Sequence, residues 1–389
     1  MKPSSEPQPE RGRQFTRLSP ARQLGFKVAA VAIGLLLALV IAEIGLRLMR
    51  PSALGSSGRE RDFFCRFDQA IGWAPLTNVS GLHVKYGRSS HVHQNQFGLR
   101  GPDDMQLVRQ DGKRRVLVLG DSYIWGHGLS QEKLFSAPEV HQTDQELVNF
   151  GVSGYGTDQE YLFYLDRGTD FRVNEVVLAL TPYNDIANNL AAKQYGYLKP
   201  YFTLEGDILV LHTNHVHDSA LRNIRNGLSR HCRVYNLVGE VIRNAGYRSE
   251  LRDASRNTAE AGREILNARD VSERDRAGVA LTVAILKKLR DTVEGQGAKF
   301  TVIFVPYSPH VDERLPGNHP LVPLIAAGLT QAGIDYVEPY PAFVAAEIAG
   351  TNMFNKPDTH FGPAGHALLA RLLTTPKTRE SGLNYYAGH

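Results

Sequence analysis

The sequence is poor in cysteine, with Cys65 and Cys232 the only two among 389 residues. At most one disulfide is therefore available to the chain. In an oxidising compartment these two residues could be bridged, or they could remain two buried thiols, and their spacing does not decide between the two. With 42% hydrophobic and 22% charged residues, the composition is that of an ordinary globular protein.

The sequence also lacks a strongly charged body. The formal net charge is +4, and the first 27 residues carry all of it. The balanced remainder argues against a nucleic-acid-binding protein. There is no G-x-x-x-x-G-K-[ST] phosphate loop and no tandem repeat, so nothing indicates a P-loop nucleotide site or a solenoid.

Long apolar runs are absent, with one exception near the N-terminus. Residues 28–42 are uninterruptedly apolar, and extension to Met49 gives a helix of about 33 Å. Either this is a cleaved signal peptide, with residues 40–42 as the cleavage site, or it is a retained anchor. The polar leader is long for a signal peptide, so we expect a transmembrane anchor at 27–49. Residues 1–26, which begin with a stretch rich in Pro, Ser, Gln and Arg, are expected to form a disordered tail. Because the positive charges precede the span, this tail is expected in the cytoplasm and the rest of the chain is expected to be exported.

Short apolar runs alternate with helix-like stretches from residue 113 onward. The strand-like runs are 115–120, 146–152, 175–182, 299–308 and 334–340, and helical patterns occupy 157–168 and 320–333. This alternation predicts an α/β fold with a mainly parallel sheet. We expect a stalk and irregular lead-in at 50–112, with 51–60 flexible. The main domain would span 113–376 with an insertion at 186–295, and 377–389 would be a tail. Within the insertion, 200–212 is expected to form a hairpin. The charge-dense 248–276 is expected to form a solvated helical face, with a substrate lid as the alternative.

Three of the predicted strands end in residues suited to acyl chemistry. Ser122 follows the first strand in Gly120-Asp121-Ser122, where it would be either a helix cap or a nucleophile. Gly154 follows the second strand, and Asn184 follows the third. Ligands of open α/β sheets bind at the carboxyl ends of strands, so these positions are expected to meet. A plain turn at Gly154 and an Asx turn at Asn184 are the alternatives.

A nucleophilic serine needs a base, and the C-terminal stretch "KPDTHFGPAGH" offers one. His360 would accept the serine proton, and Asp358 would orient the imidazole. Alternatively, the segment is a loop followed by a helix that Asp358 caps. His366 is a second candidate base, although its place inside a predicted helix favours a structural role. Ser153 is a rival nucleophile, but its surroundings do not form a G-x-S-x-G elbow.

These blocks, in this order, resemble the SGNH/GDSL-type hydrolases. The resemblance assigns the nucleophile to Ser122 and the oxyanion donors to the N–H groups of Ser122 and Gly154 and the amide of Asn184. Pro182 stands where the family's third block has glycine, and Asp358-Thr359-His360 is similar to the Asp-x-His version in exopolysaccharide O-acetyltransferase relatives. The stretch "NQFGLRGP" (95–102) resembles a lead-in of membrane-anchored members. The resemblance implies a three-layer flavodoxin-like fold.

The resemblance implies a serine esterase or O-acyltransferase that forms an acyl-serine, with no cofactor. Acylated envelope glycans or exopolysaccharide are the expected substrates, and envelope-polysaccharide machinery the expected partner. The location would be the inner membrane, with the catalytic domain in the periplasm. A lipid esterase at the membrane surface and a catalytically silent glycan-binding scaffold are the alternatives.

Two further groups of residues have open roles. Histidines gather at His91 and His93 and at His212, His215 and His217, where we expect surface side chains rather than a metal site. Four aromatic residues lie close in sequence to Ser122, Gly154 or Asn184, and they would either form a sugar-binding platform or pack the loops: Tyr123, Trp125, Tyr155 and Tyr183.

Overall fold

A parallel five-stranded sheet forms the centre of the fold, as the apolar runs predict. Its strands are β6 (Arg115–Gly120), β7 (Glu146–Gly151), β8 (Glu175–Leu180), β13 (Lys299–Phe304) and β14 (Asp335–Val337). Their order is β14-β13-β8-β6-β7, and every neighbouring pair is parallel. In chain order this is the 2-1-3-4-5 arrangement of flavodoxin-like folds, whose order reverses beside the first strand. The predicted α/β class is therefore confirmed.

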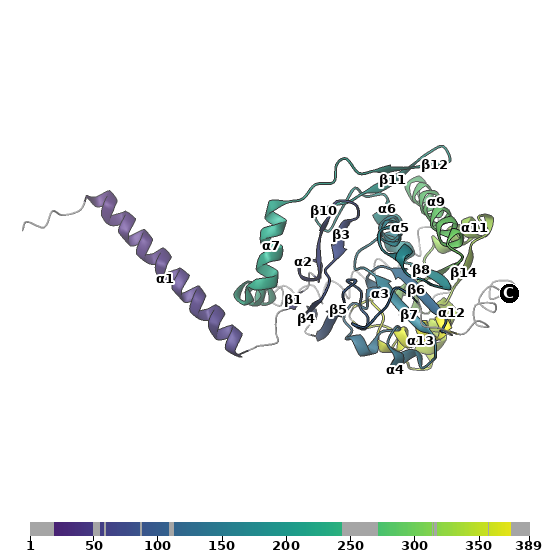
Figure 1. Cartoon of the computed structure of the whole chain (residues 1–389), viewed down its shortest axis with the longest axis horizontal. Helices are drawn as coiled ribbons and strands as arrows, with labels where there is room; N and C mark the ends of the chain where they lie inside the picture. Colours follow the sequence, from purple (N-terminus) through teal and green to yellow (C-terminus); the bar gives the residue numbers. More distant parts are fainter. Residues whose placement is uncertain are drawn as a thin grey trace, which may run out of the picture. The chain divides into compact units, whose positions relative to one another are not determined.

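Helices cover both faces of the sheet, which makes three layers (Figure 1). Leu117 and Leu119 of β6 join a core that includes residues of α5 (Thr157–Asp166), α9 (Glu273–Gly295) and α11 (Val322–Gln331). The alternate residues Val116 and Val118 join the opposite core with α12 (Tyr340–Ile348) and α13 (Pro363–Thr374). This alternation follows from the two-residue period of a strand.

The structure is a computed structural model of the chain. It describes residues 19–49, 55–57, 60–85, 88–108, 113–242, 271–312, 314, 317–356 and 358–374. Residues 1–18, the predicted C-terminal tail at 377–389 and most of the charge-dense 248–276 lie outside the described residues. The rest of the tail predicted to be disordered is not, because residues 20–26 form the first turns of α1. The chain divides into two units, Met1–Pro51 and Ser52–His389, and each is described by itself.

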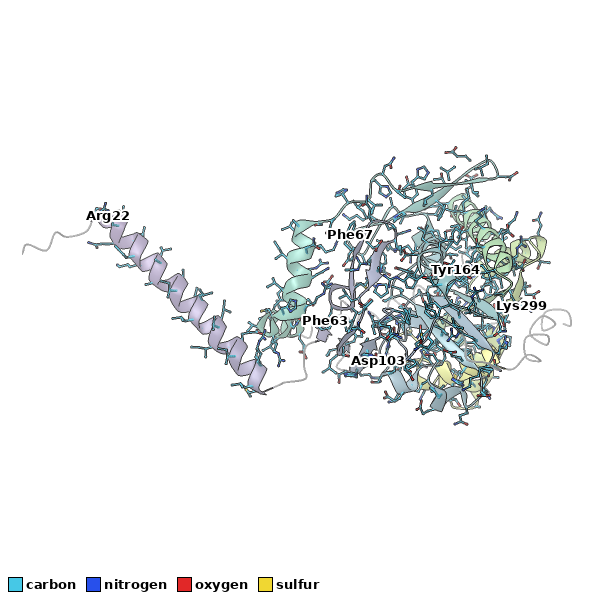
Figure 2. The ribbon with its side chains drawn as sticks, viewed as in Figure 1. Arg22, Phe63, Phe67, Asp103, Tyr164 and Lys299 are labelled. Carbon is cyan, nitrogen blue, oxygen red and sulfur yellow. The ribbon has the colours of Figure 1, made fainter. Side chains whose placement is uncertain are left out.

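The first unit contains a single long helix, α1 (Pro20–Met49), which is long and apolar enough to cross a membrane. Its side chains, including that of Arg22, project on all sides of the helix (Figure 2), and none is buried. Near its end, Arg47 Nε lies 2.8 Å from Glu43 Oε1, the pairing expected at a four-residue spacing. A membrane span and a signal sequence both fit this helix.

The lead-in is built from short strands around one helix. It contains β1 (Gly55–Ser57), α2 (Glu60–Phe64), β2 (Cys65–Asp68), β3 (Gly72–Pro75), β4 (Val79–Lys85) and β5 (Arg88–Gln94). Part of the stretch expected to be flexible is therefore ordered, since β1 pairs with β4 and Glu60 is buried. Cys65 and Cys232 form no disulfide, and burial raises the pKa of the Cys65 thiol to about 12.

A long connection of helices and short strands lies between β8 and β13. It begins with α6 (Pro182–Asn189) and continues through β9 (Lys193–Gln194), β10 (Tyr197–Leu198), β11 (Tyr201–Glu205), β12 (Ile208–His212) and α7 (Ala220–His231). The pairing of β11 with β12 confirms the predicted hairpin. The predicted insertion also includes α9, which packs against the sheet through Ile285, Leu286 and Leu289. The shorter helices are α3 (Ser122–Trp125), α4 (Pro138–His141) and α10 (Ser308–Asp312).

Candidate active site

Ser122 lies at the carboxyl end of β6, where the chain turns directly into α3. The cap of this helix is Asp121, whose side chain accepts a hydrogen bond from the Tyr123 amide, so Ser122 is the first helical residue rather than the cap. A side chain at Gly120 would place its Cβ 2.3 Å from Ile124, which explains the glycine before the turn. The turn leaves the Ser122 side chain half-buried at the edge of the sheet.

Ser122, His360 and Asp358 form a continuous hydrogen-bonded chain. Ser122 Oγ lies 2.7 Å from His360 Nε2, and His360 Nδ1 lies 2.5 Å from Asp358 Oδ1. The backbone amide of His360 also donates to Asp358 Oδ1, at 3.3 Å. Backbone bonds from Asn355 to the His360 carbonyl and from Asp358 to the Asn355 carbonyl hold the loop before α13. This arrangement can transfer a proton from the serine to the imidazole.

Gly154 and Asn184 follow the two strands that flank β6. Gly154 has φ +82°, and a Cβ there would lie 2.5 Å from the Tyr195 ring and 2.8 Å from an Arg61 nitrogen, so only glycine fits. Asn184 lies in the first turn of α6, and its Nδ2 donates to Asp121 Oδ2 at 2.8 Å. The three predicted oxyanion donors thus belong to three adjacent strand ends.

The two rival residues have other partners. Ser153 Oγ is buried, donates to Glu60 Oε1 at 2.5 Å and accepts from Arg61. His366 is also buried, and its Nδ1 accepts from the Phe135 amide. Burial is the main reason that the pKa of His366 falls to about 3, which keeps its ring neutral at ordinary pH. Neither residue is placed to join the Ser122–His360 chain.

The aromatic residues near the site mostly pack its loops. Tyr123, Trp125 and Tyr155 are buried, and Tyr155 donates to the Trp73 carbonyl. Tyr123 donates to the Thr359 carbonyl at 2.8 Å, which ties α3 to the loop that carries His360. Tyr183 is only partly buried and lies against Tyr307, with ring centroids 4.6 Å apart. Of the four, only Tyr183 is partly exposed, and its hydroxyl donates to that of Tyr123.

The predicted histidine groups have ordinary polar contacts. His93 lies 2.7 Å from both Ser80 and Asp103, and His91 is exposed on the same strand. His212 contacts Thr203, while His215 and His217 contact backbone carbonyls. His91 and His217 are exposed, whereas His93, His212 and His215 are partly buried.

Sequence reasoning missed His127, which lies next to His360, the predicted base. Its ring stacks on that of His360, with centroids 4.4 Å apart, and its Nδ1 lies 3.3 Å from Asp358 Oδ2. Asp358 therefore faces two imidazoles. His127 is five residues after Ser122, so the motif itself contained a signal for it. His83 and Glu60, which contact His127 from the lead-in, had no such signal.

Charges around the site are strongly affected by burial. Burial raises the pKa of Asp121, against the opposing effect of hydrogen bonds from the Tyr123 amide and Asn184. Burial would raise the pKa of Glu60 too, but Arg61 and then His127 hold it well below its ordinary value. Glu60 is thus a buried carboxylate that stays charged.

Comparisons with known proteins give only distant likenesses. No family model matches the chain, and no curated protein matches it. Similar solved structures include a protein assigned to the lipolytic G-D-S-L family from Desulfitobacterium hafniense, at 10% identity and a TM-score of 0.32, covering 67% of this chain and 98% of that one. TesA has 12% identity and a TM-score of 0.34, with coverage of 68% and 99%. Axe2, an acetylxylan esterase from Geobacillus stearothermophilus, has 13% identity and a TM-score of 0.34, with coverage of 68% and 94%. Scores this low carry no argument about function.

Proposed function

We propose that the protein is a serine-dependent ester hydrolase or O-acyltransferase. The observation that carries this proposal is the chain of hydrogen bonds from Asp358 through His360 to Ser122, at 2.5 and 2.7 Å. These residues come from opposite ends of the domain, and the serine lies where the strand order reverses, the usual ligand position of such sheets.

In the proposed mechanism, His360 Nε2 takes the Ser122 proton while Oγ attacks an ester carbonyl carbon. The N–H groups of Ser122 and Gly154 and the Asn184 amide stabilise the oxyanion. Collapse of the tetrahedral species breaks the ester bond, and His360 gives its proton to the departing alcohol. Water or a sugar hydroxyl then attacks the acyl-serine, with His360 as base, and Ser122 recovers its proton. Asp358 orients the imidazole throughout.

For the substrate we propose acylated envelope glycans or exopolysaccharide. Two features support this: the Asp358-x-His360 spacing, which resembles that of exopolysaccharide O-acetyltransferases, and an apolar helix suited to holding the enzyme at a membrane. We further propose that α1 spans the inner membrane, with the catalytic unit on the periplasmic side. The six basic residues before the apolar run support that orientation.

The first test is labelling of the full-length chain in detergent with a fluorophosphonate, followed by mass spectrometry of the adduct. We expect one adduct on Ser122 that is lost in Ser122→Ala. Ser153→Ala is the matched control, because it removes the neighbouring buried serine and should leave labelling intact. Absence of an adduct on a folded chain would contradict the proposal and favour a silent glycan-binding subunit.

A further inference from the structure

A second cluster of ionisable side chains lies next to the catalytic chain and is not used by the proposed mechanism. It consists of Glu60 at the start of α2, His83 in β4 and His127 in the loop after α3. The three residues are 4%, 1% and 4% exposed, so all are removed from solvent. Buried groups of this kind persist only where partners compensate for their lost hydration.

The polar atoms of this cluster converge on one point. His83 Nε2 lies 3.0 Å from His127 Nε2, and His127 Nε2 lies 3.8 Å from Glu60 Oε2. One ligand atom from each residue lies within 4.8 Å of the others. The other oxygen of Glu60 is engaged elsewhere, by Arg61 at 2.6 Å and Ser153 at 2.5 Å. Oε2 is therefore the oxygen directed to the two imidazoles.

The surroundings of His127 favour a cation at that point. Its Nδ1 lies 3.3 Å from the carboxylate of Asp358, which favours a proton on Nδ1. His127 Nε2 then presents a lone pair toward the same space as the Glu60 carboxylate. Metal-binding histidines commonly have a carboxylate beside their second ring nitrogen. The Trp125 ring lies beside both imidazoles, with centroids 6.0 Å from His83 and 6.2 Å from His127, and it packs in an apolar cluster with Phe63 and Phe64.

We propose that Glu60, His83 and His127 bind a divalent transition-metal ion, with Zn²⁺ the best match. Two imidazoles and one carboxylate are a known protein ligand set for zinc, and softer or harder ions favour other donors. Binding would replace the proton now shared between the rings and widen the nitrogen–nitrogen distance to about 3.3 Å, from zinc–nitrogen bonds of about 2.0–2.1 Å. His127, Asp358 and His360 form a second group that could hold a metal ion, but an ion there would break the hydrogen bond between Asp358 and His360. An ion held by Glu60, His83 and His127 leaves that hydrogen bond in place.

Within the second unit, the proposed ion would join the lead-in to the domain that contains the five-stranded sheet. Two ligands come from the lead-in, and the third contacts Asp358, so the ion would fix the orientation of the carboxylate that holds His360. Its role is positioning and stability rather than chemistry on the substrate. The proposal stands apart from the serine mechanism, because Ser122 can act whether or not the cluster holds metal.

The test is metal analysis of the full-length chain, carrying no oligohistidine tag, after zinc loading and gel filtration in detergent. We expect about one zinc per chain in the wild type, and loss of most of it in His83→Ala and in the isosteric Glu60→Gln. His91→Ala is the matched control, because His91 is an exposed histidine on the neighbouring strand β5 and should retain the metal. A cobalt-loaded wild type should also show visible d–d absorption that Glu60→Gln lacks.

Stability and labelling provide the second readout. We expect chelation to lower the melting temperature of the wild type and to slow fluorophosphonate labelling several-fold, with zinc restoring both. The proposal is overturned if the loaded wild type holds less than about a tenth of an ion per chain, far below the stoichiometry of a structural site. The cluster would then be a buried network of polar contacts that holds no ion. Ser122 labelling that persists without metal would leave the proposed function standing, so the two failures are distinguishable.

Discussion

At the scale of single residues, the candidate site depends on Asp358, whose two oxygens face different histidines. One accepts from His360, and the other lies 3.3 Å from His127. With the Asp-x-His spacing, the backbone amide and the ring of His360 both contact Asp358 Oδ1, which leaves Oδ2 to face His127. A carboxylate two residues from His360 can therefore hold its imidazole, and the orienting role of Asp358 stays a prediction.

Asp358→Asn tests that role. An amide would offer an N–H where His360 Nδ1 now donates, and would favour the wrong tautomer of the base. We expect kcat for a soluble acetate ester to fall by about 10³–10⁴-fold with little change in melting temperature. A large fall in melting temperature together with the loss of kcat would show a structural role for Asp358 instead.

Asn184→Ala tests the oxyanion site. If the amide donates to the developing oxyanion, its loss should lower kcat by about 10²–10³-fold, or about 2.7–4 kcal/mol in the barrier, with KM nearly unchanged. The measurement is steady-state hydrolysis of the same ester. Because Asn184 also donates to Asp121, a melting curve must show that the variant stays folded. An unchanged kcat would remove Asn184 from the oxyanion site.

Glu338 makes stability depend on pH. Burial raises its pKa to about 7, despite hydrogen bonds from the Tyr340 amide and Asn318. The folded protein then keeps a proton that the unfolded chain releases above about pH 4.5, so this stability is complete below that pH and is lost as pH rises to 7. We expect wild type to lose about 3 kcal/mol relative to Glu338→Gln over this range. Urea unfolding at both ends measures it. Glu139→Gln, at an exposed site, should lose as much stability as wild type between the two pH values. If Glu338→Gln also loses as much as wild type, the prediction is wrong.

At the scale of elements, the stretch 95–102 connects the lead-in to the turn after Ser122. Arg100 is 1% exposed and donates to the carbonyls of Trp125, Gly126 and Leu129 at 2.8–2.9 Å. These carbonyls belong to the end of α3 and the loop that carries His127. A resemblance noted in the sequence thus corresponds to a buried brace beneath the site.

Arg100→Met tests this brace. Removal of the guanidinium leaves three carbonyls without this donor, and we expect at least about 3 kcal/mol of lost stability together with slower serine labelling. Urea unfolding and labelling rates measure both effects. Arg172→Met, which alters an exposed arginine, is the control and should change neither. Full stability in Arg100→Met would show that water or a neighbour replaces the donor.

The elements also show what the sequence could and could not predict. Buried strands such as 115–120 and the hairpin at 200–212 were predictable because their period and turn residues are local signals. The contacts of Glu60 and His83 with His127 were not, since they depend on how the lead-in packs against the sheet. The approach of His360 to Ser122 across 238 positions was expected because a nucleophilic serine needs a base, and the family resemblance supported that choice.

At the scale of the whole molecule, α1 is the element that would hold the proposed enzyme at a membrane. Thirty residues of helix extend about 45 Å, more than the roughly 30 Å of a bilayer core, and the pairing of Glu43 with Arg47 reduces the cost of charge near one end. We therefore expect the mature protein to retain its N-terminus and to stay with membranes after a carbonate wash. Removal of residues 1–51 should release the second unit with Ser122 still open to labelling. Mass spectrometry of the mature N-terminus checks the first expectation, and fractionation checks the second. An N-terminus that begins at Glu43 would contradict the anchor and establish a cleaved signal, because the apolar run would then be absent from the working protein.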